Sequence, residues 1–196
     1  MRSRLFGAAV LLCGLAGAPA VHAEELLFQQ SSFFDAVDEV RVGGAFHQVY
    51  GGLFPFDPAL YSFARPETVS FDVLFRSPEM FAWFGSPRPE FGATVSLTGY
   101  ESMAHLGLTW QLQVFDSPFF IQGTFGAALN NGYTIGAPAG YKNMGCNLGF
   151  YESAGIGADL PGKLTATLTY EHTSNLSLCT PNEGLSNLKF QLGMKF

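Results

Sequence analysis

Apolar and polar residues alternate in eight segments of about ten residues each. Successive side chains of a β-strand point to opposite faces, so each segment has the pattern of a strand with one apolar face. An even number of such strands, separated by turn residues, is typical of a closed antiparallel barrel. The pattern predicts strands over residues 38–49, 67–76, 89–98, 102–115, 118–129, 147–160, 163–174 and 186–196.

The last two segments show the alternation most clearly. One face of each is apolar, and the other carries Thr, Gln, Glu or Lys. A membrane barrel turns its apolar face to lipid, and a soluble lipocalin-like barrel turns it inward. Alternation alone leaves both open, but the aromatic content and a last strand that ends in Phe196 favour the membrane. We therefore expect an all-β, eight-stranded antiparallel transmembrane barrel of the outer membrane. The apolar faces comprise Leu164, Ala166, Leu168 and Tyr170, then Leu188, Phe190, Leu192, Met194 and Phe196.

Composition narrows the class of protein further. Of the 196 residues, 13% are charged and 15% aromatic, which is too few charges and too much aromatic surface for a disordered chain. The net charge is −6, and Lys and Arg form no cluster, which argues against nucleic-acid binding. The chain length suits one domain.

The first 23 residues have the pattern of a secretory signal peptide. Arg2 and Arg4 precede an apolar run over residues 5–18, and small residues stand at Val21 and Ala23. We expect export, removal of residues 1–23, and one barrel domain over residues 24–196. The remaining cysteines, Cys146 and Cys179, then lie in an oxidising compartment.

The connections orient the barrel, because such proteins have short periplasmic turns and longer outer loops. Asp116–Ser117 and Pro161–Gly162 are the expected periplasmic turns, while residues 50–66, 130–146 and 175–185 are expected to form outer loops. Residues 77–88 form a long periplasmic link whose aromatic residues suit the membrane interface. Pairing across Pro161–Gly162 makes opposite residue numbers add to about 322. Position 176 then lies across from Cys146, and a Cys146–Cys179 disulfide between two outer loops is expected.

His172 and Ser174 are the candidate reactive pair. They stand two apart on one strand, about 6.6 Å along it, on the face shared with Leu168 and Tyr170. A base and a hydroxyl facing the outer leaflet suit attack on a lipid ester, with Ser174 as nucleophile and His172 as base and then acid. The alternative is a polar rim histidine without a catalytic role. His47 and His105 have no acid or cysteine at metal-ligand spacing, and we expect no metal site there.

Two motifs add a family resemblance. EHTSN at residues 171–175, PNEGL at residues 181–185 and the strand that ends in Phe196 resemble the lipid A 3-O-deacylase family. The resemblance implies a serine esterase that removes the 3-linked hydroxyacyl chain from lipid A in the outer leaflet, without a metal or cofactor. Lipopolysaccharide would be its partner, and a homodimer stays open. By motif, His172 and Ser174 would be base and nucleophile, and the oxyanion donors would be Asn175, Asn182 and the Gly184 backbone.

The family's acidic position is occupied by Ser186. A hydroxyl can accept the imidazole N–H but cannot stabilise the imidazolium by charge. Glu171 points into the barrel, so the candidate replacement acids are Glu152, a diagonal neighbour of His172 in the expected register, and more weakly Glu183 in the loop. Glu152 could equally be a rim residue bound to loop amides or lipid-associated cations.

Three functions therefore compete. The first is a lipid A esterase, and the second is a catalytically idle barrel with a structural or lipopolysaccharide-binding role. The third, a soluble lipid-binding barrel, would fractionate with the periplasm without detergent.

Overall fold

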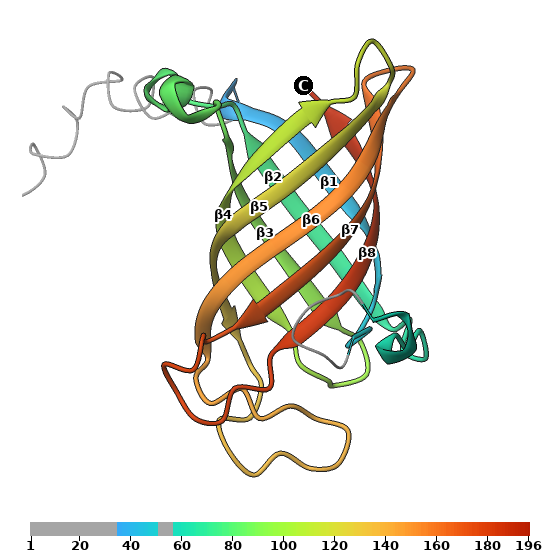
Figure 1. Ribbon diagram of the computed structural model, residues 1–196. Helices are drawn as coiled ribbons and strands as arrows, with labels where there is room; N and C mark the ends of the chain where they lie inside the picture. The colour runs from blue at the N-terminus through green and yellow to red at the C-terminus, as the bar shows by residue number, and fades with distance from the viewer. Residues whose placement is uncertain (1–34, 51–56) are drawn as a thin grey trace, which may run out of the picture. The chain divides into compact units, whose positions relative to one another are not determined.

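The computed structural model describes residues 35–50 and 57–196, and the expected signal peptide lies outside them. Within these residues, none of the helices is long and apolar enough to cross a membrane. Eight antiparallel strands form a closed barrel in sequence order, with β1 hydrogen-bonded to both β2 and β8 (Figure 1). The strands are β1 Val37–Phe46, β2 Thr68–Phe75, β3 Arg88–Ser96, β4 Met103–Gln113, β5 Phe119–Asn130, β6 Leu148–Leu160, β7 Leu164–Ser174 and β8 Leu185–Lys195. The expected all-β barrel and its eight strands are confirmed.

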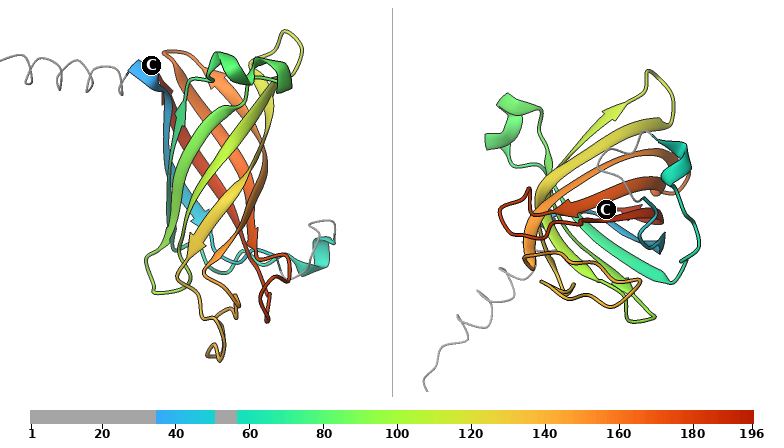
Figure 2. Two further views of the ribbon diagram at one scale, coloured as in Figure 1. Left: turned by 90° about the vertical axis from the view of Figure 1, so that its left-hand side faces the viewer. Right: turned by 60° about the horizontal axis from the view of Figure 1, so that its bottom comes forward.

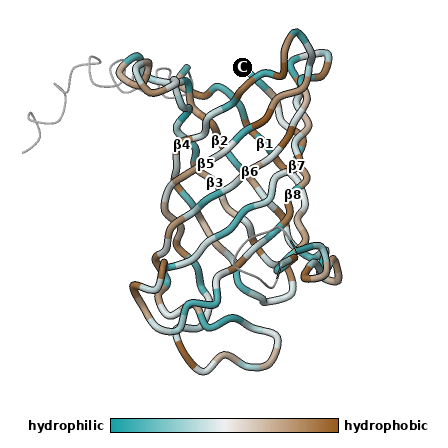
Figure 3. Tube along the Cα trace, viewed as in Figure 1, coloured by the Kyte–Doolittle hydropathy of each residue, from teal (hydrophilic) through white to brown (hydrophobic). Residues whose placement is uncertain are grey.

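The polar faces of the strands point into the barrel. In β7, Thr165, Thr167 and Thr169 are at most 2% exposed, while Leu164 and Leu168 are 40% and 42% exposed on the outside. Polar and apolar positions alternate along the strands in Figure 3. A wall that is apolar outside and polar inside is stable only where lipid surrounds it, so the arrangement is that of a membrane barrel and not of a lipocalin-like one.

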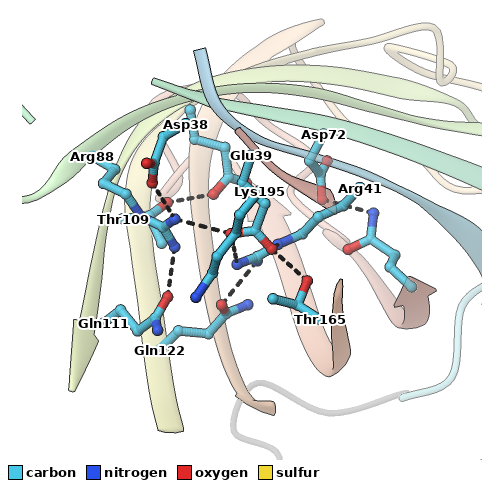
Figure 4. Close-up of polar contacts among 12 residues, drawn as sticks. Asp38, Glu39, Arg41, Asp72, Arg88, Thr109, Gln111, Gln122, Thr165 and Lys195 are labelled. Atoms are coloured by element: carbon cyan, nitrogen blue, oxygen red, sulfur yellow. Dashed lines mark hydrogen bonds and ion pairs between the residues drawn. The ribbon is translucent and has the colours of Figure 1, made fainter. Parts of the chain in front are cut away.

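Charged side chains fill one part of the lumen and neutralise one another. Arg41 donates two hydrogen bonds of 2.8 Å to the Glu39 carboxylate and one of 2.9 Å to Gln122. Arg88 donates to Asp38 and Glu39 at 2.8 and 2.9 Å (Figure 4). Because each buried charge has a partner, the lumen avoids the large cost of an isolated ion.

A second buried network centres on Lys189. Its ammonium lies 2.9 Å from Asp72 and 3.1 Å from Glu171. Glu171 also accepts hydrogen bonds from Tyr151 and Asn187, at 3.1 and 2.9 Å. Glu171 therefore points inward, as its position in the alternation predicts, and belongs to the barrel interior.

Two turns are longer than the sequence pattern suggests. Residues 161–163, not two residues, connect β6 to β7, because Lys163 adopts a left-handed φ of 65° after Gly162 at 78°. The ladder therefore pairs Leu160 with Leu164. Between β4 and β5 the connection is residues 114–118, with Phe115 at a φ of 51°. The predicted two-residue turns at Asp116–Ser117 and Pro161–Gly162 are wrong in length.

The long loops gather at one end of the barrel, opposite these turns (Figure 2). The short 3-10 helix η1, Pro58–Leu60, lies in the first of them. Cys146 and Cys179 form a disulfide with a Cα–Cα distance of 5.8 Å, which joins the loop before β6 to the loop after β7. The expected disulfide between Cys146 and Cys179 is confirmed, and the outward orientation of the two loops stays a prediction.

At the other end, the link between β2 and β3 contains the 3-10 helix η2, Glu79–Phe84. Trp83 is 84% exposed there, and Trp110 donates from Nε1 to the Phe84 carbonyl at 3.0 Å. The indole of Trp110 thus fixes the segment to the rim. Its role as an aromatic anchor at the membrane interface stays a prediction.

Candidate active site

The candidate pair lies where β7 reaches the loop end of the barrel. Ser174 is the last residue of β7, and His172 stands two residues before it on the same outward face. Ser174 is only 7% exposed, although its place in the alternation puts it on the outward face. The Ser174 hydroxyl makes no hydrogen bond to any of the described residues. It is therefore available to a bound ester.

Ser186 holds the ring of His172 from the neighbouring strand. The two residues are cross-strand partners, and His172 Nδ1 lies 2.7 Å from Ser186 Oγ. Tyr170 donates from its hydroxyl to the same Oγ at 2.9 Å. Ser186 is 2% exposed. Ser186, which the motif resemblance predicts to stand at the family's acidic position, thus contacts the imidazole nitrogen that an orienting acid would contact.

Glu152 lies beside the other nitrogen. Its Oε1 is 4.0 Å from His172 Nε2, and its side chain is 43% exposed. The expected register placed Glu152 opposite Tyr170, but the ladder pairs it directly with His172, because the extra turn residue Lys163 shifts the pairing. Glu152 therefore faces the nitrogen that would exchange a proton with Ser174, not the nitrogen held by Ser186. Its carboxylate can stabilise an imidazolium by charge at this distance.

Gly184 brings the loop backbone against the same edge of the ring. Its φ is +63°, a left-handed conformation that favours glycine. A β-carbon there would lie 2.8 Å from Cε1 and 3.2 Å from Nε2 of His172. Only glycine allows the loop to pack this closely beside His172 Nε2.

The two asparagines have different surroundings. Asn175 donates from Nδ2 to the carbonyls of Met144 and Pro181, at 2.6 and 3.2 Å, so both hydrogens of its amide are engaged. Asn182 accepts the Asn175 backbone N–H on Oδ1 at 2.9 Å. The Asn182 amide nitrogen donates to none of the described residues. Among the described residues the Gly184 backbone N–H also donates to no backbone carbonyl. Of the predicted oxyanion donors, only Asn175 is thus fully engaged, and it holds the loop together.

Glu183 is directed away from the histidine. Its carboxylate accepts hydrogen bonds from the side chain and the backbone N–H of Asn143, each at 3.0 Å. These bonds lower the pKa of the Glu183 carboxyl below its ordinary value of 4.5. Glu183 therefore stays ionised and tied to the neighbouring loop.

An apolar cavity of about 440 Å³ adjoins the serine on the outer wall. Phe150, the cross-strand partner of Ser174, belongs to its lining, and Leu178 of the disulfide-linked loop covers one side. The cavity has the apolar lining that an acyl chain requires. It is lined by Phe125, Gly126, Ala127, Cys146, Leu148, Gly149, Phe150, Asn175 and Leu178.

The remaining histidines lie in ion-pair networks. Buried His105 has Nε2 2.9 Å from Glu90 and 3.7 Å from Asp72, and these three groups come from neighbouring strands. They are close enough to hold a metal, with ligand atoms within 4.8 Å of one another. Sequence spacing missed this cluster because the acids come from other strands. Lys189 Nζ already lies 2.9 Å from Asp72 there, so these three groups belong to a buried ion-pair network. His47 contacts Glu101 at 3.1 Å near the loops.

The fold and the surface together define the class of protein: an outer-membrane β-barrel. The family model described as lipid A 3-O-deacylase (PagL) matches residues 69–195, and the chain belongs to this family. The family's members are hydrolases that deacylate lipid A. The match to this family therefore confirms the resemblance based on the EHTSN and PNEGL motifs.

Solved structures agree on the fold. A crystal structure of the outer membrane enzyme PagL aligns with a TM-score of 0.52 and 15% identity, covering 82% of this chain and 100% of that one. The N-terminal β-barrel domain of Pseudomonas aeruginosa OprF aligns with a TM-score of 0.50 and 10% identity, covering 82% and 98%. Among curated proteins, no sequence matches the chain.

Tyr170 is the site residue that sequence reasoning did not assign. The alternation places it among the apolar positions of its strand, on the same face as His172, and the ladder puts it diagonal to Ser186. Diagonal neighbours on adjacent strands are within reach of a long aromatic side chain. The diagonal position of Tyr170 relative to Ser186 is therefore the signal from which this contact could have been predicted.

Proposed function

We propose that this protein is a serine esterase that hydrolyses the 3-linked hydroxyacyl ester of lipid A in the outer leaflet. The observation that carries the proposal is the placement of His172 and Ser174 on the lipid-facing wall at the loop end, with His172 Nδ1 held by Ser186 at 2.7 Å. Membership in the lipid A deacylase family supports the substrate class.

The chemistry follows the serine-hydrolase scheme. Ser174 Oγ attacks the ester carbonyl carbon while its proton passes to His172 Nε2. The carbonyl oxygen becomes an oxyanion, for which the Asn182 amide and the Gly184 backbone N–H are the proposed donors. The carbon–oxygen bond to the sugar then breaks, and the sugar oxygen takes the proton from His172. Water releases the hydroxy fatty acid from Ser174 in a second round of the same steps.

Two further features support an ester substrate with a long acyl chain. The apolar cavity beside Ser174 can take the chain, and the polar loops lie where a sugar headgroup would be. In this proposal, Glu152 and Ser186 together take the two roles that one carboxylate has in a Ser-His-acid triad. Ser186 orients the ring, and Glu152 supplies negative charge near the imidazolium.

Mass spectrometry of lipid A from cells that express the protein tests the proposal. We expect loss of one hydroxyacyl mass with the wild type, and unchanged lipid A with Ser174→Ala or His172→Ala. Ser62→Ala, an exposed loop serine, is the matched control and should act as the wild type. Unchanged lipid A with an inserted wild-type barrel would contradict the proposal.

One observation favours the alternative, an idle barrel that binds lipopolysaccharide or serves in envelope structure. Ser186 carries no charge, and the nearest carboxylate, Glu152, is 4.0 Å from the ring without a hydrogen bond. Under this alternative the purified barrel retains lipopolysaccharide without converting it, and Ser174→Ala binds it equally well.

A further inference from the structure

A chain of three hydroxyl and imidazole groups runs along the outer wall beside the proposed nucleophile. Tyr170 donates to Ser186 Oγ at 2.9 Å, and Ser186 Oγ lies 2.7 Å from His172 Nδ1. Tyr170 is half-buried, whereas Ser186 is only 2% exposed. Among the described residues, Ser186 Oγ has these two hydrogen-bond partners alone, so any hydrogen it carries must point to one of them.

Counting hydrogens shows why the second partner matters. A histidine that takes a proton at Nε2 carries its own hydrogen on Nδ1, and Ser186 Oγ must accept that hydrogen. The Ser186 hydroxyl hydrogen then has one remaining acceptor, the oxygen of Tyr170. A buried hydroxyl with no acceptor is costly, so without Tyr170 the serine would donate to Nδ1 instead. That arrangement leaves the hydrogen on Nε2 and removes the base.

We propose that Tyr170 is a positioning residue that acts through Ser186 to set which nitrogen of His172 carries the proton. In the structure Tyr170 donates across the 2.9 Å contact. Both oxygens carry a hydrogen and hydroxyl groups rotate, so the direction of this bond reverses when Ser186 accepts the hydrogen of His172 Nδ1. When His172 donates to Ser186, Ser186 donates to Tyr170, and the half-exposed phenol turns its hydrogen to the polar interface. Two hydroxyls thus take over the orienting part of the family's carboxylate. This inference rests on the proposed function.

The test is a double-mutant cycle on the refolded full-length mature chain, with purified lipid A as the substrate. We expect Tyr170→Phe to lower kcat about tenfold while KM changes less than about twofold, because the ring is retained and a single hydrogen-bond group is lost. In a Ser186→Ala background the same change should have no further effect, since the chain is already broken. Tyr133→Phe, in an outer loop, is the matched control and should leave kcat unchanged. Losses that add in the double variant would overturn the proposal.

A second measurement needs no substrate. The ¹⁵N chemical shifts of the His172 ring, assigned by their loss in His172→Gln, report which nitrogen is protonated. We expect the Nδ1-protonated form in the wild type and a shift towards the Nε2-protonated form in Tyr170→Phe. An unchanged tautomer would overturn the positioning role. A different pair of results separates the two proposals. If the tautomer shifts in Tyr170→Phe but the wild type does not hydrolyse lipid A, the role of Tyr170 is supported and the proposed function is contradicted.

Discussion

Buried charged groups are ion-paired in the lumen, whereas polar groups are incompletely paired on the outer wall around His172. In the lumen, Lys189 is fully buried and ion-paired to two carboxylates, at 2.9 and 3.1 Å. On the wall, Glu152 is 43% exposed at 4.0 Å from His172, and the Ser174 hydroxyl has no partner among the described residues. Fully paired polar groups stabilise a fold, whereas incompletely paired groups at a surface are available for chemistry. The incompletely paired polar groups of this barrel therefore lie on its outer wall, where we propose that the chemistry takes place.

The largest expected effect is a loss of folding stability when the ion pairs of the lumen are broken. Lys189→Met removes the cation between Asp72 and Glu171 and leaves two buried carboxylates without their counter-ion. We expect a loss of about 3–5 kcal/mol of folding free energy, measured by urea unfolding in lipid vesicles. The folded fraction should retain its rate of lipid A hydrolysis, because the network does not touch His172. A stability within about 1 kcal/mol of the wild type would contradict this account.

The next effect concerns the wall. Ser186→Glu introduces a carboxylate next to Nδ1, at the position that the motif resemblance predicts to be acidic. We expect kcat to rise about 100-fold, since charge then stabilises the imidazolium and the carboxylate can only accept. Rates come from release of hydroxy fatty acid, and Ser186→Gln, of similar size but neutral, is the control. A rise of equal size in both variants would show that charge is not the missing element.

A smaller effect separates the two acids near the site. Glu152→Gln removes negative charge 4.0 Å from His172 Nε2, and we expect hydrolysis to fall about tenfold. Glu183→Gln should leave the rate within about twofold, because its carboxylate bonds Asn143 and not the histidine. Equal rates for the two variants would remove Glu152 from the mechanism and favour its role as a rim residue.

The smallest effect is a pH dependence at the loop end. Burial raises the pKa of Glu101, but hydrogen bonds from His47 and the Lys142 backbone N–H outweigh it, so the pKa lies below 4.5. A lowered carboxyl pKa contributes stability that is present above the unfolded value and lost as the pH falls through the folded value. We expect Glu101→Gln to cost less than about 1 kcal/mol at pH 7 and to lose this difference from the wild type in acid below pH 4.5. Urea unfolding at both pH values measures it, and a difference that grows in acid would have the wrong sign.

Much of the fold followed from the alternation of side chains. The two-residue alternation alone was enough to predict the strands and the inward position of Glu171. Predicting the disulfide also required the assumption that β6 and β7 pair as a hairpin. The register failed because Lys163 enters a left-handed turn conformation, which no periodicity reveals, and this moved Glu152 from a diagonal to a direct partner of His172. In the candidate site, the motifs predicted His172 and Ser174 as base and nucleophile, and these roles stay predictions. The engagement of the Asn175 amide and the role of Tyr170 depend on loop packing and diagonal contacts, which come from tertiary structure.

The disulfide between Cys146 and Cys179 gives the site a particular topology. With a sequence separation of 33, it closes β6, β7 and their turn into one covalent ring, and Glu152, His172 and Ser174 all belong to that ring. A protease that cuts the chain once inside the ring releases no fragment, because both ends stay joined. At a cell surface, such a ring keeps these three residues covalently joined after a nick that would separate the halves of an uncrosslinked hairpin.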